Sequence, residues 1–267
     1  MITLLTDFGV ADYFVPAVKG VIYTVHSEAR VVDVTHDIVE HDIESAAFTL
    51  GACYREFPAG TIHVAVVDPG VGSARRPIVV EAGGQIFVGP DNGIFSYVYA
   101  READVRVYRI EREELFRRPV SPTFHGRDVF APVAAHLEAG RVRPAELGER
   151  VADPVRIELP APQPVAHGAI RGCLIQVDRF GNCVTNLTAN ELRLVPPGRP
   201  GPQWMLTVGA FKIVFFTTHF AAHPREGELF AYLGSAGYWE VGLWRASAAA
   251  LIDARRGMEA LLEPRWI

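Results

Sequence analysis

Residues 62–72 read Ile-His-Val-Ala-Val-Val-Asp-Pro-Gly-Val-Gly, and this stretch decides the fold. The run Ile62–Val67 is almost entirely apolar and stops at Asp68-Pro69-Gly70. A short apolar run that is bounded by turn residues is typical of a strand buried on both of its faces. We therefore predict that residues 62–67 form a strand inside a sheet that helices cover on both sides.

The surrounding sequence alternates between strand-like and helix-like patterns. Further short runs rich in β-branched or apolar residues predict strands at 2–5, 30–34, 78–81 and 85–88. Apolar residues with helical spacing predict helices at 12–26, 42–57 and 129–139. Gly83-Gly84 lies between two of the strands and indicates a hairpin. Strands that alternate with helices predict an α/β domain with a mostly parallel central sheet.

The pattern changes after residue 152. Four prolines (154, 160, 162 and 164) fall in a stretch with little periodicity, which indicates a linker. Beyond it, short strands are expected at 169–177, 204–208, 212–217, 229–233 and 238–243. The proline-rich residues 196–202 predict a rigid loop. We expect an α/β N-terminal domain over 1–155, a linker over 156–168, and a smaller all-β, barrel-like C-terminal domain over 169–267.

Composition excludes several classes of protein. The 267 residues are 49% hydrophobic and 21% charged, which argues against a disordered chain. The net charge of −5 and the absence of a Lys/Arg run argue against a nucleic-acid or anionic membrane partner. No apolar run reaches the roughly 18 residues of a transmembrane helix, and the start resembles no signal peptide. The three cysteines form no CxxC pair. We expect a cytoplasmic enzyme or binding protein.

Polar side chains of the N-terminal domain gather where predicted strands end, which is where ligands bind in open α/β sheets. Asp7 follows the first strand and could hold a sugar diol, or it could cap a helix. Asp68 and Arg75 could flank a small polar group such as water, or they could form a structural pair. His125 could titrate near neutral pH or be structural, and Asp128 could cap the following helix.

The C-terminal domain has one comparable segment, Asp178-Arg179-Phe180-Gly181-Asn182. Its carboxylate and amide stand beside an aromatic ring, a combination that suits adenine or ribose. The alternative is a tight hairpin that needs Gly and Asn for its backbone.

A cluster of acids and histidines, Asp33, His36, Asp37, His41 and Asp42, lies within ten residues and could indicate a metal site. The segment has the pattern of a strand followed by a loop, so the spacing alone does not make these side chains converge. Capping and loop hydrogen bonds are the interpretation that we favour over a metal-dependent hydrolase.

Six motifs in order along the chain resemble those of the S-adenosyl-L-methionine hydroxide adenosyltransferases, which are relatives of fluorinase and chlorinase. These motifs are Thr6-Asp7-Phe8-Gly9, Val34-Thr35-His36, residues 67–72, Gly89-Pro90-Asp91-Asn92-Gly93, Phe124-His125-Gly126-Arg127-Asp128 and Phe180-Gly181-Asn182. The resemblance covers nearly the whole chain. It departs from the family pattern at residues 241–245, where an asparagine-containing turn is expected and this chain has Val-Gly-Leu-Trp-Arg.

The resemblance implies hydrolysis of S-adenosylmethionine to adenosine and L-methionine, without metal or cofactor. It also implies a homotrimer whose active sites lie between the N-terminal domain of one subunit and the C-terminal domain of its neighbour. The implied catalytic residues are Asp68, Arg75 and His125. The implied substrate-binding residues are Asp7 and Asp68 for ribose, Asp178 and Asn182 for adenine, and Tyr232, Ser235 and Glu240 nearby.

The sequence disfavours halogenation, and a metal-dependent hydrolase and a sensor remain as the two alternatives to this hydrolase. The halogenases of the same family carry Tyr where this chain has Asp68, and they lack the Arg75 and His125 pairing; a carboxylate at that position would repel halide. A sensor that binds adenosine or S-adenosylmethionine without turnover is the second alternative. Stoichiometric binding without product would favour the sensor.

Overall fold

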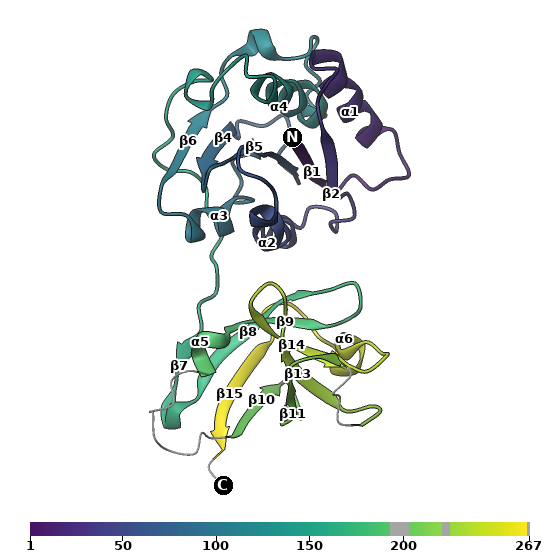
Figure 1. Cartoon of the computed structure of the whole chain (residues 1–267), viewed down its shortest axis with the longest axis vertical. Coiled ribbons are helices and arrows are strands. Elements are labelled where there is room, and N and C mark those ends of the chain that lie inside the picture. The colour runs from purple at the N-terminus through teal and green to yellow at the C-terminus, as the bar shows by residue number, and fades with distance from the viewer. Residues whose placement is uncertain (193–202, 221–224, 266–267) are drawn as a thin grey trace. The chain divides into compact units, whose positions relative to one another are not determined.

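The computed structural model describes residues 1–192, 203–220 and 225–265. The chain forms two compact units, Met1–Leu159 and Pro160–Ile267, and each has its own hydrophobic core (Figure 1). The proline-rich loop expected at 196–202 lies outside the described residues. Within the described ranges, no helix has the length and apolar character needed to cross a membrane.

The N-terminal unit is built on a six-stranded sheet of order β2-β1-β3-β5-β4-β6. Its strands are β1 (Ile2–Thr6), β2 (Val31–Thr35), β3 (Ile62–Val66), β4 (Pro77–Ala82), β5 (Gln85–Pro90) and β6 (Val105–Arg109). Strand β1 lies between β2 and β3 and runs parallel to both, and β3 is parallel to β5. Only β4 runs against its neighbours, as the predicted hairpin with β5 requires. The prediction of a mostly parallel sheet is confirmed.

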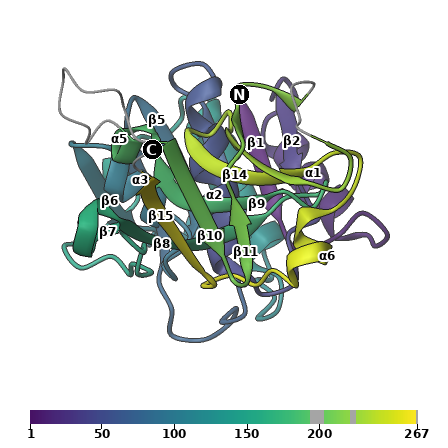
Figure 2. The same ribbon diagram turned by 90° about the horizontal axis from the view of Figure 1, so that it is seen from below.

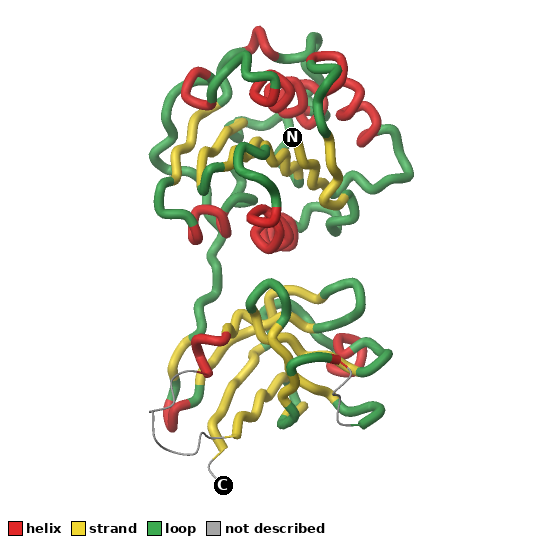
Figure 3. The backbone as a smooth tube through the Cα atoms, in the orientation of Figure 1, coloured by secondary structure: helices red, strands yellow, loops and turns green. Residues whose placement is uncertain are grey.

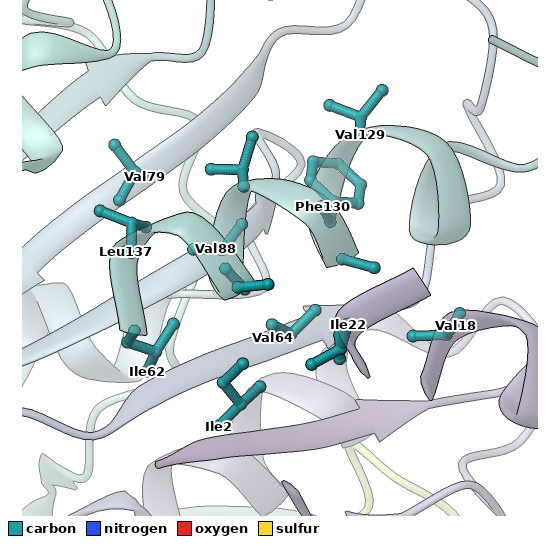
Figure 4. Packing of buried hydrophobic residues seen from close by; sticks show 14 of the residues in the cluster. Ile2, Val18, Ile22, Ile62, Val64, Val79, Val88, Val129, Phe130 and Leu137 are labelled. Carbon is teal, nitrogen blue, oxygen red and sulfur yellow. The ribbon is translucent and has the colours of Figure 1, made fainter. Parts of the chain in front are cut away.

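Helices cover both faces of this sheet, as Figures 1 and 3 show. The helices are α1 (Phe14–Val25) and α4 (Ala131–Glu138) on one face, and α2 (Ile43–Cys53) and α3 (Ser96–Arg101) on the other. Figure 4 shows the first core, where Ile22 lies beside Val64 and Phe130 lies above the strand that carries Ile62 and Val64. These side chains are at most 2% exposed, so each aliphatic one contributes about 2 kcal/mol by leaving water.

Local chemistry explains where the helices begin and how closely they approach. The carboxylate of Asp42 caps α2 by accepting a hydrogen bond from the Ser45 amide at 2.9 Å. Gly51 lets α2 approach α3, because a Cβ at residue 51 would lie 2.7 Å from Cβ of Tyr97. The helix predicted at 129–139 is α4, and a π-helix, Gly126–Phe130, leads into it.

The C-terminal unit is a barrel-like β structure, which confirms the expected fold class. Its strand order is β11-β10-β15-β8-β9-β14-β13-β12, with β7 beside β8. The strands are β7 (Gln163–Pro164), β8 (Ile170–Val177), β9 (Cys183–Thr188), β10 (Gln203–Val208), β11 (Phe211–Ile213), β12 (Phe216–Thr217), β13 (Leu229–Leu233), β14 (Tyr238–Leu243) and β15 (Glu259–Arg265). Figure 2 shows β10 and β15 side by side, as their antiparallel pairing requires.

Strand β8 connects the two halves of this structure. Its residues 170–173 pair with β15, and its later residues pair with β9. In place of the single strand expected at 212–217 there are two short strands, β11 and β12. Residues 214–215 separate them and belong to neither strand. The remaining short helices are α5 (Ala189–Leu192), α6 (Ala248–Ile252) and the 3-10 helices η1 (Tyr54–Glu56), η2 (Glu113–Leu115), η4 (Pro144–Glu146) and η5 (Ala166–Gly168).

Candidate active site

The parallel pairing of β1 with β3 brings two of the predicted carboxylates to one edge of the sheet. Thr6 pairs with Val66, so Asp7 and Asp68 each follow the carboxyl end of neighbouring strands. Both line one cavity of about 330 Å³, which we call the front cavity. Oδ2 of Asp7 accepts a hydrogen bond from the backbone amide of His41 at 3.0 Å. Asp7 is therefore fixed at the cavity wall and does not cap a helix.

Three phenylalanines form an apolar wall of the front cavity. Phe8, Phe14 and Phe124 all line it, and their ring centroids lie 5.2–5.9 Å apart. Their edge-on and tilted contacts fix the wall. A Cβ at Gly126 would lie 3.2 Å from the Phe8 ring, which explains a small residue beside His125.

Asp68, Arg75 and His125 form one connected group. Nε of Arg75 donates to Oδ1 of Asp68 at 3.0 Å, and Nη2 donates to Oδ2 of the same carboxylate. Nη2 also lies 2.8 Å from Nδ1 of His125. The Asp68 and Arg75 side chains are only 4% and 10% exposed, so this is a buried two-bond ion pair of the strong kind.

The contact with Arg75 determines the state of His125. A guanidinium can only donate, so Nδ1 of His125 must accept, and the ring proton then lies on Nε2. Burial lowers the pKa of His125 below its usual 6.5, and the positive charge of Arg75 lowers it further. His125 is therefore neutral at pH 7 and lines the front cavity as an N–H donor.

Backbone packing holds this group in place. Gly72 has φ 77°, and a Cβ there would collide with the carbonyl oxygen of Pro122, three residues before His125. The amide of Asn92 donates to the carbonyl of Val67 at 2.8 Å and so fixes the residue before Asp68. Arg75 also lies over the ring of Phe130, 5.3 Å from its centroid.

Other polar residues of the same motifs are structural. Asp128 does not cap a helix as expected; it is fully buried, and its carboxylate accepts hydrogen bonds from Arg127, Arg117 and the Ser121 amide. The prediction was wrong because Asp128 lies inside the π-helix Gly126–Phe130, whose N-cap residue is His125. Asp91 in the same way accepts from Arg76 at 2.7 Å.

The suspected metal cluster does not converge. His36 contacts Thr6 through Nδ1 at 2.8 Å and lies 3.1 Å from Asp33. Asp33 accepts from Lys19 at 2.6 Å, while Asp42 caps α2. Among the residues with described positions, no three His, Cys, Asp or Glu side chains are placed to share a metal ion.

The C-terminal unit gathers the five other predicted residues in a second cavity of about 1040 Å³. The predicted residues that line it are Asp178, Asn182, Tyr232, Ser235 and Glu240. Trp244 and Arg245, from the stretch that departs from the family pattern, also line this cavity, as does Phe220. No motif in the sequence assigned these three residues to a site: Trp244 and Arg245 follow β14, and Phe220 lies between β12 and β13.

Two polar pairs organise this second cavity. Asp178 accepts hydrogen bonds from the amides of Phe180 and Asn182 and from the Asn182 side chain, at 2.7–2.9 Å. This is the tight turn considered as an alternative, and it lies at the cavity wall. Tyr232 donates to Glu240. Burial raises the pKa of Tyr232, and the Glu240 carboxylate raises it further; burial and the charge of Asp178 raise the pKa of Glu240.

Comparison with known proteins decides the family. Residues 2–148 match the SAM hydroxide adenosyltransferase N-terminal domain, and residues 172–260 match the C-terminal domain of that name. The chain belongs to the SAM hydroxide adenosyltransferase family. The resemblance inferred from the six motifs is thereby confirmed.

Relatives of this adenosyltransferase family align over nearly the full chain. The (R)-S-adenosyl-L-methionine hydrolase of Thermus thermophilus is 37% identical over 265 residues, 97% of each chain. A fluorinase of Nocardia brasiliensis is 27% identical over 97% of this chain and 95% of its own. The crystal structure of an uncharacterized conserved protein from Thermotoga maritima matches with a TM-score of 0.89 and 32% identity, over 98% of this chain and 100% of that one.

Proposed function

We propose that this protein is an enzyme that hydrolyses S-adenosyl-L-methionine to adenosine and L-methionine. The observation that carries the proposal is the buried Asp68–Arg75–His125 group at the wall of the front cavity. The identity with (R)-S-adenosyl-L-methionine hydrolases over the full chain supports the same substrate.

The reaction that we propose is an in-line displacement at C5′ of the substrate. The oxygen of a water molecule forms a bond to C5′ while the C5′–S bond breaks, and its electron pair stays on sulfur as a neutral thioether. One proton of the water remains on the new 5′-hydroxyl and the other leaves. Because the leaving group departs without charge, this chemistry needs neither a general acid nor a metal. The main requirement is a positioned nucleophile, which can supply several kcal/mol.

The geometry suggests a separate role for each of the three side chains. Asp68 lines the front cavity and accepts the departing proton of the water. The neutral His125 donates its Nε2 hydrogen to an oxygen, and it does not relay a proton because Arg75 already donates to Nδ1. Arg75 is a positioning residue, since it holds both of the others. Loss of charge in the transition state is favoured in a pocket shielded from water.

We further propose that substrate recognition is shared between the two units. Asp7 and Asp68 would bind the ribose hydroxyls in the front cavity. The second cavity would bind adenine through Asp178 and Asn182, with Tyr232, Ser235 and Glu240 completing the substrate contacts. A homotrimer in the cytoplasm, with each active site between the N-terminal unit of one subunit and the C-terminal unit of its neighbour, would account for this division.

The conservative variant Asp68→Asn tests the catalytic proposal. It removes the proton acceptor but keeps the shape of the side chain, and we expect adenosine formation to fall about a thousandfold. Treatment with a chelator should leave the wild type active, whereas loss of activity would favour the metal-dependent alternative. Binding without any adenosine in the wild type would favour the sensor.

Subunit mixing tests the shared site. Asp68→Asn damages only the N-terminal half of a site, and Glu240→Gln damages only the C-terminal half. If sites form between subunits, co-refolded mixtures of the two variants contain some sites with both halves intact and regain activity. A mixture no more active than its two components would contradict the proposed arrangement, and light scattering would report the number of subunits.

A further inference from the structure

A second cavity in the N-terminal unit lies against the same catalytic group. This back cavity has a volume of about 500 Å³. It is lined by Ser73, Ala74, Arg75, Pro77, Arg109, Ile110, Glu111, Glu113, Phe116 and His125. Asp68 lines only the front cavity and Arg75 lines only the back cavity, whereas His125 lines both. Arg75 and His125 therefore form a partition between the two.

One nitrogen of this partition lacks a protein partner. Nη1 of Arg75 is buried and makes no hydrogen bond to any described residue. The Arg75 side chain as a whole is 90% buried, with 10% of it exposed. Nε and Nη2 are both committed to Asp68, so Nη1 projects from the other side of the guanidinium, away from that carboxylate. Buried donors of charged groups are normally satisfied by protein or by ordered water.

The lining of the back cavity suits water. Arg109 and Arg75 contribute positive charge, and Glu111 and Glu113 contribute negative charge, so the cavity favours neither an anion nor a cation. Ser73 adds a hydroxyl. A cavity of this volume has room for several water molecules, each with the two to four polar partners that a buried water needs.

We propose that the back cavity is the water site that supplies the nucleophile of the reaction. This inference rests on the proposed function. In an in-line displacement the water must attack from the side opposite to the departing sulfur, while the nucleoside fills the front cavity. A water molecule bound to Nη1 of Arg75 lies in the back cavity, on the other side of the partition from the substrate. It moves past His125, the residue common to both cavities, and replaces the water molecule that the reaction has consumed.

A plug at Ala74 tests this route. Ala74 is an exposed residue of the cavity lining. We expect Ala74→Phe to lower kcat about tenfold or more, with the Kd for S-adenosylmethionine and for adenosine within about twofold of wild type. The matched control is Ala59→Phe, which places the same side chain at an exposed alanine before β3. This control should keep the wild-type kcat.

Failure of the route and failure of the function are distinguishable. A wild type that forms no adenosine contradicts the function itself. If the wild type forms adenosine and the Ala74→Phe variant has the same kcat, the result contradicts the water route and leaves the proposed function intact. If Ala74→Phe does not fold, Ala74→Leu gives a smaller plug. A high-resolution crystal structure of the wild type decides independently: we expect an ordered water within hydrogen-bond distance of Nη1 of Arg75, and its absence would overturn the proposal.

Discussion

Replacement of Arg75 by alanine is the most informative single change to the proposed catalytic group. The wild-type guanidinium makes two hydrogen bonds to Asp68 and one to His125. Arg75→Ala removes all three and leaves the Asp68 carboxylate buried without its counter-charge. Arg75→Lys is the control, because an ammonium keeps the charge but lacks the planar fork that serves both partners.

The size of the effect follows from burial. Loss of one partner from a buried ion pair costs about 3–5 kcal/mol, and we take the lower end, about 3 kcal/mol, because Asp68 lines a cavity. Arg75→Lys should lose about half as much stability at pH 7.

Two optical signals separate the units in the assay. All four tryptophans lie beyond residue 200, in the C-terminal unit, whereas the longest helices, α1 and α2, lie in the N-terminal unit. Urea denaturation of Arg75→Ala should therefore shift the transition seen by circular dichroism more than the transition seen by tryptophan fluorescence. Adenosine formation should fall at least a hundredfold. A circular-dichroism transition of Arg75→Ala at the same urea concentration as in the wild type would refute the reasoning.

Three further expectations concern neighbouring contacts. Because Nδ1 of His125 accepts from Arg75, protonation of His125 breaks the group, and kcat should be lost as pH falls through the His125 pKa, below 6.5; an inflection above 6.5 in a pH profile of kcat would contradict this. Gly72→Ala should cost about 1–3 kcal/mol by thermal denaturation, because φ is positive there and a Cβ collides with a carbonyl; a melting temperature equal to wild type would count against it. Tyr232→Phe should weaken adenosine binding about tenfold by calorimetry, because Glu240 loses its donor, and unchanged affinity would remove this pair from the site.

The sheet of the N-terminal unit was predictable because its strands carry an unambiguous pattern. Ile62–Val66 is buried at every position, so an apolar run alone identified it. Strand β9 was missed because Thr185 and Asn186 interrupt its apolar pattern. In the structure both are buried, since Thr185 donates to the carbonyl of Trp239 and Asn186 to that of Pro160. Tertiary hydrogen bonds of this kind have no signal in a single sequence.

Other missed elements have equally local reasons. Strand β15 contains charged residues and Pro264, which paired contacts with β10 accommodate. Strand β6 and helix α3 are short, and each obtains its order from packing against a neighbouring element. Intrinsic preference is a weak guide for such segments.

The residues of the candidate site could be predicted from the sequence, but their geometry could not. Asp68 and Arg75 stood out as polar groups after a strand, yet their two-bond contact depends on the loop at Gly72 packing on Pro122, fifty residues along the chain. The approach of His125 to Arg75 depends on the same packing. No spacing rule relates segments so far apart, so structural and catalytic interpretations stayed equally open until the fold brought them together.

The origin of the oxygen in the product tests the central claim most directly. Chelator-treated protein is incubated with S-adenosylmethionine in water labelled with oxygen-18, and the products are analysed by mass spectrometry. We expect adenosine with the label in its 5′-hydroxyl, together with unlabelled L-methionine, which establishes attack of water at C5′. Adenosine without the label, or bound substrate with no adenosine at all, would contradict the hydrolytic role of Asp68, Arg75 and His125.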